Sequence, residues 1–470
     1  MLFPTFGFLL FFLVVAAGLA ALDGRFAAKK ALLVGASYYF YAQWDWRFCF
    51  LLAASSGLSF GAGWLVGALA DRRRQRRVLG VAVALHLLLL GVFKYLDFFV
   101  ASANELARLL GLQHEVPFLE VILPVGISFF TFHGVSYLVD VYRGDVAVCR
   151  NPLDMLLYMS FFPQLVAGPI VRAAYFLPQL ARPAEEPIPI AAAVWLILGG
   201  LFKKIVVANY LATGLVDPVF AAPQDYGAPD LILAAYAYAV QIYCDFSAYT
   251  DMAVALAALC GFRFPANFDQ PYRAERLREF WQRWHISLST WLRDYLYRPL
   301  GGNRRGRWLT YRNLLLTMLL GGLWHGAAWK FVAWGALHGG GLAIERMLEP
   351  LLGRHARTLP GRILATAIVF HFVCVAWVFF RAEDFTLAGV YLAGLGRGWG
   401  GGVQQAGPAM VALIALGMAG QFLPPGLFER GAAAFGRLPV WGLGAAAGIV
   451  VAAIDALGPD GVAPFIYFRF

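Results

Sequence analysis

Two histidines stand out among the residues that could carry chemistry, because each lies among apolar neighbours. His325 occurs in GGLWHGAAWKF, and His285 occurs in FWQRWHISLSTWLRDYLY. Histidine has an ordinary pKa of about 6.5, which suits proton transfer near neutral pH. The sequence therefore makes His325 a candidate general base, with a hydrogen-bonded structural role as the alternative.

Glycines and alanines surround His325 on both sides. Small residues let another backbone or a narrow acyl chain approach closely. Trp324 and Trp329 are candidates for the walls of such a slot. We expect His325 to lie far from either end of a membrane span over residues 313–329, where it would be buried yet reachable.

His285 is predicted to lie on an amphipathic helix from Glu275 to Tyr297. Apolar residues recur there at positions i, i+3, i+4 and i+7, and three tryptophans are among them. We expect this helix to lie along the membrane interface, with its tryptophans at the level of the headgroups. Taken alone, His285 fits a structural role. A metal shared with His325 is an alternative, but no carboxylate or cysteine has ligand spacing nearby, so no metal site is predicted.

A third polar group lies in the segment QIYCDFSAYTDMAV. Asp245, Tyr249 and Asp251 stand at i, i+4 and i+6 of an expected helix. Polar side chains inside a membrane are costly, so they usually face a cavity or each other. A buried polar network that lines an internal pathway is the preferred interpretation, and a direct catalytic role is the alternative.

The elements that position these residues are membrane helices. Of the 470 residues, 60% are hydrophobic and 14% are charged, whereas a soluble chain carries about 25% charged residues. Uncharged runs recur at the length that spans a bilayer, about 20 residues. We predict an all-α, polytopic membrane bundle of about eleven or twelve spans, some of them re-entrant or interfacial. The five cysteines show no disulfide or zinc spacing.

Composition divides the chain into three parts. Residues 1–119 and 346–470 are mostly aliphatic, and the last part ends in FIYFRF. Residues 120–345 contain the polar spans and a cytoplasmic segment at 263–312. The net charge is +10, and clusters of arginine and lysine follow the first and third apolar runs. The positive-inside rule puts these loops in the cytoplasm and the N-terminus outside. Topology thus accounts for the charge, and nucleic-acid binding is not predicted.

Several long stretches resemble one family. They are LPVGISFFTFHGVSYLVDVYRG, YMSFFPQLVAGPIVR, QIYCDFSAYTDMAVALAALCGFRFPANFDQPY, FWQRWHISLSTWLRDYLYRPLGGNR and GGLWHGAAW. Together they are similar to the membrane-bound O-acyltransferases, in the bacterial branch that contains the alginate O-acetyltransferase membrane subunit. The resemblance covers about residues 120–345. Ala248 and Lys330 depart from the family pattern, and Lys330 follows the WHGAAW core; neither departure is at a histidine.

The resemblance implies a helical bundle around a central tunnel, in the bacterial inner membrane. With the orientation from the basic loops, the N-terminus is expected to be periplasmic. It places His325 at the near-invariant family histidine and His285 at a second polar position. It implies transfer of an acetyl group from a cytoplasmic donor to an exported polysaccharide such as alginate, with cellulose or peptidoglycan as alternative polymers. His325 would be the general base, and His285 would orient the donor or stabilise the oxyanion.

The resemblance also suggests partners for the reaction. Acetyl-CoA is the expected co-substrate, no bound cofactor is expected, and Arg304, Arg305 and Arg307 are candidate contacts for its phosphates; simple membrane topology is the alternative explanation of these arginines. A periplasmic esterase-like protein is the expected partner. Tyr467, in FIYFRF, is a candidate acyl carrier, with an aromatic interface anchor as the alternative.

Two functions of other classes remain open at this point. Polar residues within spans also occur in transporters, so a flippase for a polymer precursor is an alternative. A scaffold that recruits periplasmic enzymes, without chemistry of its own, is another.

Overall fold

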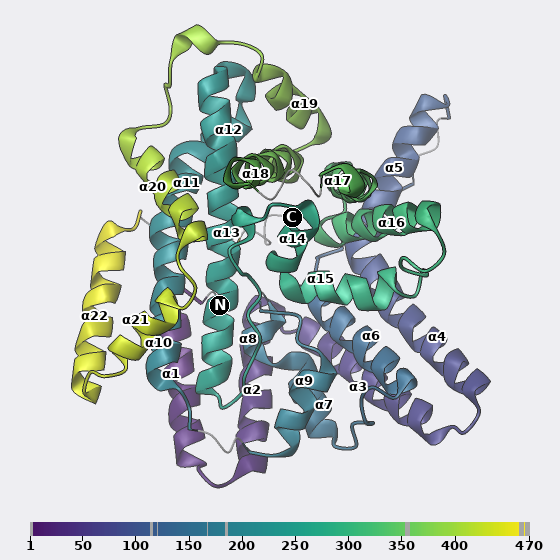
Figure 1. Cartoon of the computed structure of the whole chain (residues 1–470). Coiled ribbons are helices and arrows are strands. Elements are labelled where there is room, and N and C mark those ends of the chain that lie inside the picture. Colours follow the sequence, from purple (N-terminus) through teal and green to yellow (C-terminus); the bar gives the residue numbers. More distant parts are fainter. Residues whose placement is uncertain are drawn as a thin grey trace. The chain divides into compact units, whose positions relative to one another are not determined.

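The computed structural model describes residues 3–112, 116–119, 121–166, 168–183, 187–352, 358–459 and 465. Across these residues the chain is helical and contains no strand (Figure 1). It divides into two compact units, one of residues 3–188 and 256–264 and the other of residues 189–255 and 265–470. The three-part division expected from composition stays a prediction.

The first unit contains the first nine helices of the chain. These are α1 (Phe6–Ala21), α2 (Phe26–Asp45), α3 (Phe48–Ala68), α4 (Arg72–Leu90), α5 (Leu96–Leu109), α6 (Ile127–Arg143), α7 (Pro152–Ser160), α8 (Phe162–Leu165) and α9 (Ala173–Ala181). A π-turn, η1 (Gly91–Tyr95), joins α4 to α5. A buried ion pair between Lys30 and Asp154 ties α2 to α7.

The second unit contains both histidines of interest. Its helices are α10 (Ile190–Leu201), α11 (Asn209–Leu211), α12 (Asp217–Ala221), α13 (Ala228–Leu259, whose last turn belongs to the first unit), α14 (Leu277–Arg283), α15 (Ile286–Leu292), α16 (Arg307–His325), α17 (Trp329–Leu352), α18 (Leu359–Arg381), α19 (Phe385–Gly394), α20 (Pro408–Ala419), α21 (Leu427–Phe435) and α22 (Val440–Leu457). Two π-helical stretches, η2 (Phe202–Ala208) and η3 (Ala212–Val216), flank α11, and a third, η6 (Arg293–Tyr297), follows α15.

The described residues contain six helices that are long and apolar enough to cross a membrane, or seven if a bent pair counts as one span. The six cover Phe48–Ala68, Arg72–Leu109, Ile190–Ala221, Ala228–Leu259, Leu359–Arg381 and Val440–Leu457, and the bent pair joins Pro408–Phe422 to Leu427–Phe435 at 97°. The chain is thus a multi-pass membrane protein. By this measure the spans are fewer than the eleven or twelve predicted. One reason is that the apolar run at 153–170 folds as the short helices α7 and α8, which part at Phe161.

The single amphipathic helix predicted from Glu275 to Tyr297 is wrong. The chain forms α14, breaks at Trp284 and His285, and continues as α15 and η6. His285 has φ 43° and ψ 56°, a left-handed conformation that no α-helix interior allows. Periodicity did not reveal the break because the apolar residues of both pieces are buried in the protein. The tryptophans of this segment are only 1–9% exposed, so they are not interfacial anchors.

Helices α16 and α17 pack tightly against each other, with α14 beside them (Figure 1). Glycine makes this approach possible. A Cβ at Gly322 would lie 2.1 Å from the carbonyl oxygen of Phe331, and one at Gly335 would lie 2.4 Å from that of Met318. The small residues near His325 therefore serve backbone packing between two helices, and the space at Gly322 is not an open slot for an acyl chain.

Candidate functional site

His325 is the last residue of α16, where the chain turns toward α17. It was expected far from either end of its span, and that expectation is wrong, because Gly326 is extended and ends the helix. The imidazole is 5% exposed. Its ring centroid lies 5.0 Å from those of Trp324 and Trp334 and 5.2 Å from that of Phe380. The imidazole of His325 therefore lies at the end of a helix, surrounded by aromatic rings and with little access to water.

His285 occupies the break between α14 and α15 and is fully buried. The side chain and backbone of Asn267 hold the next turn in place: the N–H of Ile286 donates to the Asn267 carbonyl at 2.9 Å, and the N–H of Ser287 donates to Asn267 Oδ1 at 3.0 Å. His285 Nδ1 lies 3.4 Å from the Ser287 hydroxyl. Among the described residues, His285 Nε2 has no hydrogen-bond partner.

This orphaned ring nitrogen is a notable feature of the site. A buried polar atom without a partner costs about 1–3 kcal/mol, so native proteins usually satisfy such atoms with water or a ligand. Burial also lowers the pKa of His285 to about 3, which keeps the ring neutral at neutral pH; the residue lies outside the candidate spans. A neutral imidazole with one ring nitrogen unoccupied can donate or accept one hydrogen bond to a substrate.

The structure brings the two histidines together at one tryptophan. The ring of Trp324 lies 6.0 Å from that of His285 and 5.0 Å from that of His325. Trp324 is 4% exposed, and its expected role as a wall residue stays a prediction. On its other side, His285 meets the ring of Phe246 at 4.7 Å. His285 and His325, which are 40 positions apart in the sequence, thus lie beside the same tryptophan.

Trp329 does not form the second wall. Its side chain is 60% exposed at the start of α17. Five residues later on α17, Trp334 packs against His325 instead, and it is 1% exposed. On its other side, the ring of Trp334 lies 4.7 Å from that of His338. Sequence reasoning missed Trp334, although a helix starting at Trp329 puts positions 329 and 334 on different faces.

The three polar residues of α13 have basic partners that sequence reasoning also missed. Lys204 forms an ion pair with Asp245 at 2.8 Å, and both side chains are almost completely buried. Lys203 forms an ion pair with Asp251 and a hydrogen bond to Ser247. Tyr249 lies beside Lys204, which is 5.8 Å from its ring centroid. Consecutive lysines in an apolar run mark such pairs, because an unpaired lysine is costly inside a membrane.

Tyr467 lies outside the described residues, but Phe465 lies within them. The ring of Phe465 is fully buried, 4.3 Å from that of Tyr249 and 5.8 Å from that of Phe246. Phe246 in turn contacts His285. The terminal aromatic motif therefore begins one ring away from a histidine of the site.

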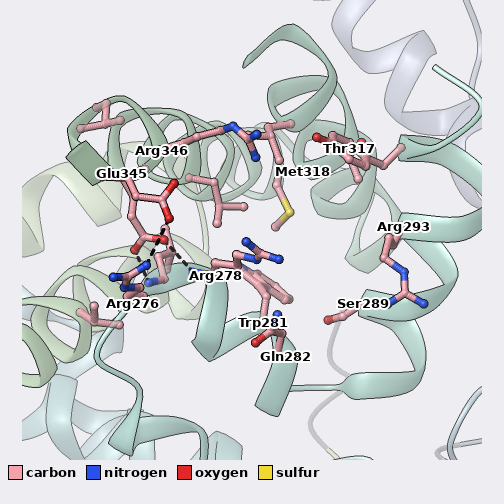
Figure 2. Close-up of a pocket in the computed structure, with 18 of the residues that line it drawn as sticks. Arg276, Arg278, Trp281, Gln282, Ser289, Arg293, Thr317, Met318, Glu345 and Arg346 are labelled. Carbon is pink, nitrogen blue, oxygen red and sulfur yellow. Dashed lines mark hydrogen bonds and ion pairs between the residues drawn. The ribbon is translucent and has the colours of Figure 1, made fainter. Parts of the chain in front are cut away.

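A cavity of about 1200 Å³ opens beside α14 and α15 and is bounded by α16, α17 and α18 (Figure 2). Arg304 is part of its lining, whereas Arg305 and Arg307 are not. Trp281 forms part of the wall and donates its indole N–H to His338 Nδ1 at 3.3 Å. Ring contacts continue from His338 through Trp334 to His325. A row of aromatic and imidazole rings therefore separates this cavity from the histidine.

Comparison with known proteins identifies the family. The model of the membrane-bound O-acyltransferase family matches residues 149–383. The chain is 44% identical over 391 residues to the probable alginate O-acetylase AlgI of Pseudomonas aeruginosa, covering 83% of this chain and 73% of that one. It is 36% identical over 393 residues to the peptidoglycan O-acetyltransferase of Helicobacter pylori, covering 78% and 73%. With the teichoic acid D-alanyltransferase of Bacillus subtilis the identity is 30% over 276 residues, or 56% and 69% of the two chains.

The matched region includes both histidines, the row of rings and the cavity. The protein therefore belongs to the membrane-bound O-acyltransferase family, and it is an O-acyltransferase.

Proposed function

We propose that this enzyme acetylates the hydroxyl groups of an exported polysaccharide such as alginate, with acetyl-CoA as the donor. One observation supports the proposal most: two buried histidines, from different segments, both contact Trp324. The names of the relatives in Pseudomonas and Helicobacter, both polymer O-acetylases, support the class of acceptor.

In the proposed reaction His325 is the general base. It accepts the proton of an acceptor hydroxyl while that oxygen bonds to the carbonyl carbon of the acetyl thioester. The tetrahedral intermediate then collapses, the carbon–sulfur bond breaks, and the thiolate takes the proton back from the imidazolium. The products are an acetate ester and a free thiol. Because water is largely excluded around His325, the proton passes between the reactants and not to solvent.

His285 stabilises the negative charge that develops on the thioester oxygen. When the Ser287 hydroxyl donates to Nδ1, the proton of the ring resides on Nε2, the atom without a partner. The Nε2–H group can then donate to the oxyanion. Such a donor is worth about 10²–10³ in rate in other enzymes.

Replacement of His325 tests the assignment. In His325→Ala, acetyl transfer to polymer should fall by about 10²–10⁴-fold, which is the usual contribution of a general base. His371→Ala is a matched control, because His371 is also on a membrane helix of this unit but bonds to Tyr236 at an exposed position. Normal transfer by a folded His325→Ala enzyme would exclude the proposed base.

Tyr467 is the proposed acyl carrier between this protein and its partner. Covalent geometry limits the separation of the Cα atoms of Phe465 and Tyr467 to about 7 Å, and Phe465 docks one ring away from His285. The Tyr467 hydroxyl would attack the thioester with loss of its proton to His325, forming an aryl acetate and releasing the thiol. A hydroxyl of the partner or of the polymer would then take the acetyl group and restore the phenol.

Two measurements test the carrier. Tyr467→Phe should abolish polymer acetylation but leave acetyl-CoA binding intact, whereas Tyr311→Phe, on α16, should change neither. With radiolabelled acetyl-CoA, acid-stable and alkali-labile label should appear on a peptide containing Tyr467. Wild-type acetylation by Tyr467→Phe would favour the aromatic anchor instead.

The proposed setting is the bacterial inner membrane, with a periplasmic N-terminus and an esterase-like partner protein in the periplasm. The basic clusters after the first and third apolar runs support this orientation. Labelling of a single cysteine introduced near the N-terminus with a membrane-impermeant reagent tests the orientation. If the cysteine is labelled only after the membrane is opened, the N-terminus lies on the cytoplasmic side and the proposed orientation is wrong.

A further inference from the structure

The cavity beside α14 and α15 has one side that faces out of the protein. On α18, which is long and apolar enough to cross a membrane, Leu364 and Ile368 line the cavity and are 60% and 61% exposed. Ile344, on α17, lines it too and is 57% exposed. Hydrocarbon, and not water, surrounds an exposed apolar side chain on a membrane span. Along this side the cavity is therefore open to the acyl chains of the bilayer.

Charged side chains line the same cavity, and the protein itself satisfies the carboxylates among them. These are Glu275, which pairs with Arg362, Glu349, which pairs with Arg276, and Glu345, which accepts the backbone N–H groups at the start of α14. These interactions leave no lining carboxylate for the remaining arginines.

The lining contains more arginines than acids. Three of its arginines form ion pairs, namely Arg276, Arg293 and Arg298. In the part of the chain that the structure describes, the other arginines of the lining have no carboxylate partner; they are Arg278, Arg304 and Arg346. Guanidinium groups without counterions on one hollow create a positive potential that attracts anions. The cavity therefore favours an occupant with a net negative charge.

Two of these guanidinium groups converge. Figure 2 shows Arg278, from α14, and Arg346, from α17, extending toward the same part of the hollow. The phenol of Tyr297 lies near both. Burial raises its pKa, while the charges of Arg346 and Arg278 act in the opposite direction, which requires that both be close to the phenol. The arrangement is a fork of planar donors from separate helices, suited to phosphate oxygens.

Charge and apolar surface follow a fixed order along the two helices. On α18, Leu364 and Ile368 lie beyond the charged Arg362, by about 3 and 9 Å at a rise of about 1.5 Å per residue. On α17, Ile344 precedes Arg346 and lies farther from the C-terminal end of the helix. Apolar side chains thus begin next to the charged ones and continue inward along the span. This order matches an amphiphile with a charged head and a hydrocarbon tail.

Other kinds of occupant match only part of the cavity. A soluble anion satisfies the arginines but makes no contact with the exposed Leu364 and Ile368. A zwitterionic lipid covers the apolar side, but its head carries its own cation and brings no net charge to the arginines. A membrane lipid with a net negative head matches both parts.

We propose that this cavity binds an anionic phospholipid of the surrounding membrane. Arg278 and Arg346 hold the phosphate, and an acyl chain lies against Ile344, Leu364 and Ile368. Basic pockets between membrane helices bind headgroups of this kind. The row of rings from α14 to α16 separates the lipid from the histidine of the site, so the inference does not depend on the proposed reaction.

Lipid binding to the purified full-length protein tests the proposal. Native mass spectrometry in a nonionic detergent compares phosphatidylglycerol with phosphatidylcholine, two diacyl lipids that differ in net charge. Wild type should bind phosphatidylglycerol about tenfold more tightly. Arg278→Gln and Arg346→Gln should each weaken phosphatidylglycerol binding by about 5- to 30-fold and leave phosphatidylcholine binding unchanged. Arg278→Lys should recover part of the loss because it keeps the charge.

Each part of the site has a matched control. Arg307→Gln changes an exposed arginine outside the lining and should keep the affinity for phosphatidylglycerol within about twofold of wild type. Leu364→Ser should weaken binding by about three- to tenfold because the acyl chain loses an apolar contact. Ile363→Ser, at the neighbouring and similarly exposed position outside the lining, should not weaken it.

Three results would overturn the proposal. The first is equal affinity for phosphatidylglycerol in Arg278→Gln, Arg346→Gln and Arg307→Gln. The second, which applies even if the arginine variants fail to fold, is equal affinity in Leu364→Ser and Ile363→Ser. The third is arginine-dependent binding of inorganic phosphate or coenzyme A by a protein that does not bind phosphatidylglycerol, because the anion would then come from solution.

Discussion

The buried ion pair between Lys204 and Asp245 allows a quantitative prediction. The Nζ and Oδ1 atoms are 2.8 Å apart, and the two side chains are 2% and 4% exposed. In Lys204→Met the carboxylate of Asp245 would remain buried without its counterion. Breaking such a pair from one side costs about 3–5 kcal/mol. We expect the free energy of unfolding to fall by this amount.

The neighbouring pair provides an internal control. Lys203 and Asp251 also form an ion pair, but their side chains are 23% and 30% exposed, so the protein encloses them less completely than Lys204 and Asp245. Lys203→Met should therefore cost less stability than Lys204→Met. The two lysines are adjacent in sequence, so the contrast depends mainly on how deeply each pair is buried.

The double variant Lys204→Met/Asp245→Leu removes both charges and should recover most of the lost stability, since apolar replacements of buried pairs are often neutral or stabilising. The measurement is equilibrium unfolding in mixed micelles, with tryptophan fluorescence as the probe. Two results would refute the reasoning: a loss in Lys204→Met no larger than in Lys203→Met, or a double variant as unstable as Lys204→Met.

Three further predictions concern the site. His285→Asn should be more stable than His285→Val by about 1–2 kcal/mol, because asparagine tolerates the left-handed backbone at this position and a β-branched residue does not. Thermal unfolding of the two variants measures the difference, and equal stability would contradict the prediction. Phe465→Ala should lower acetyl transfer at least tenfold with little change in the melting temperature, because the Phe465 ring packs beside Tyr249 and Phe246. Phe465→Leu should keep most of the activity. A kinetic assay compares the two variants, and full activity in Phe465→Ala would argue against a role for this packing. Burial lowers the pKa of His285 to about 3, so below pH 6.5 the unfolded chain binds a proton that the native ring does not. The free energy of unfolding should therefore fall by about 1.4 kcal/mol for each pH unit of acidification through this residue. His285→Asn should show a shallower pH slope in denaturation experiments, and an unchanged slope would refute the lowered pKa of His285.

The residue types and their order along the chain were enough to predict much of this protein. Apolar runs predicted a polytopic helical membrane protein, and the histidine motifs placed the centre of interest on His325 and His285. Trp324 was predicted to lie beside His325 because the two adjoin in sequence, and their ring centroids are 5.0 Å apart. These features depend on local composition and on residues next to one another, which a sequence shows directly.

Periodicity failed where the protein buries both faces of a segment. The pattern from Glu275 to Tyr297 fits one helix, yet the chain turns at His285 because Asn267, about 20 positions earlier, binds the backbone after it. Likewise, the glycines near His325 could not reveal whether a ligand or another helix fills the space beside them. Backbone contact between α16 and α17 decided that question.

The sequence by itself determined the class of protein and the family, and it singled out the two histidines as candidates, since each depends on residue identity and short-range order. Only the tertiary structure decided which partners these residues have. Lys204 neutralises Asp245, Trp334 and not Trp329 packs against His325, and Arg278 and Arg346 line one cavity whereas Arg305 and Arg307 do not. Charge balance, burial and ring contacts are properties of groups brought together from distant positions, and a linear order does not specify them.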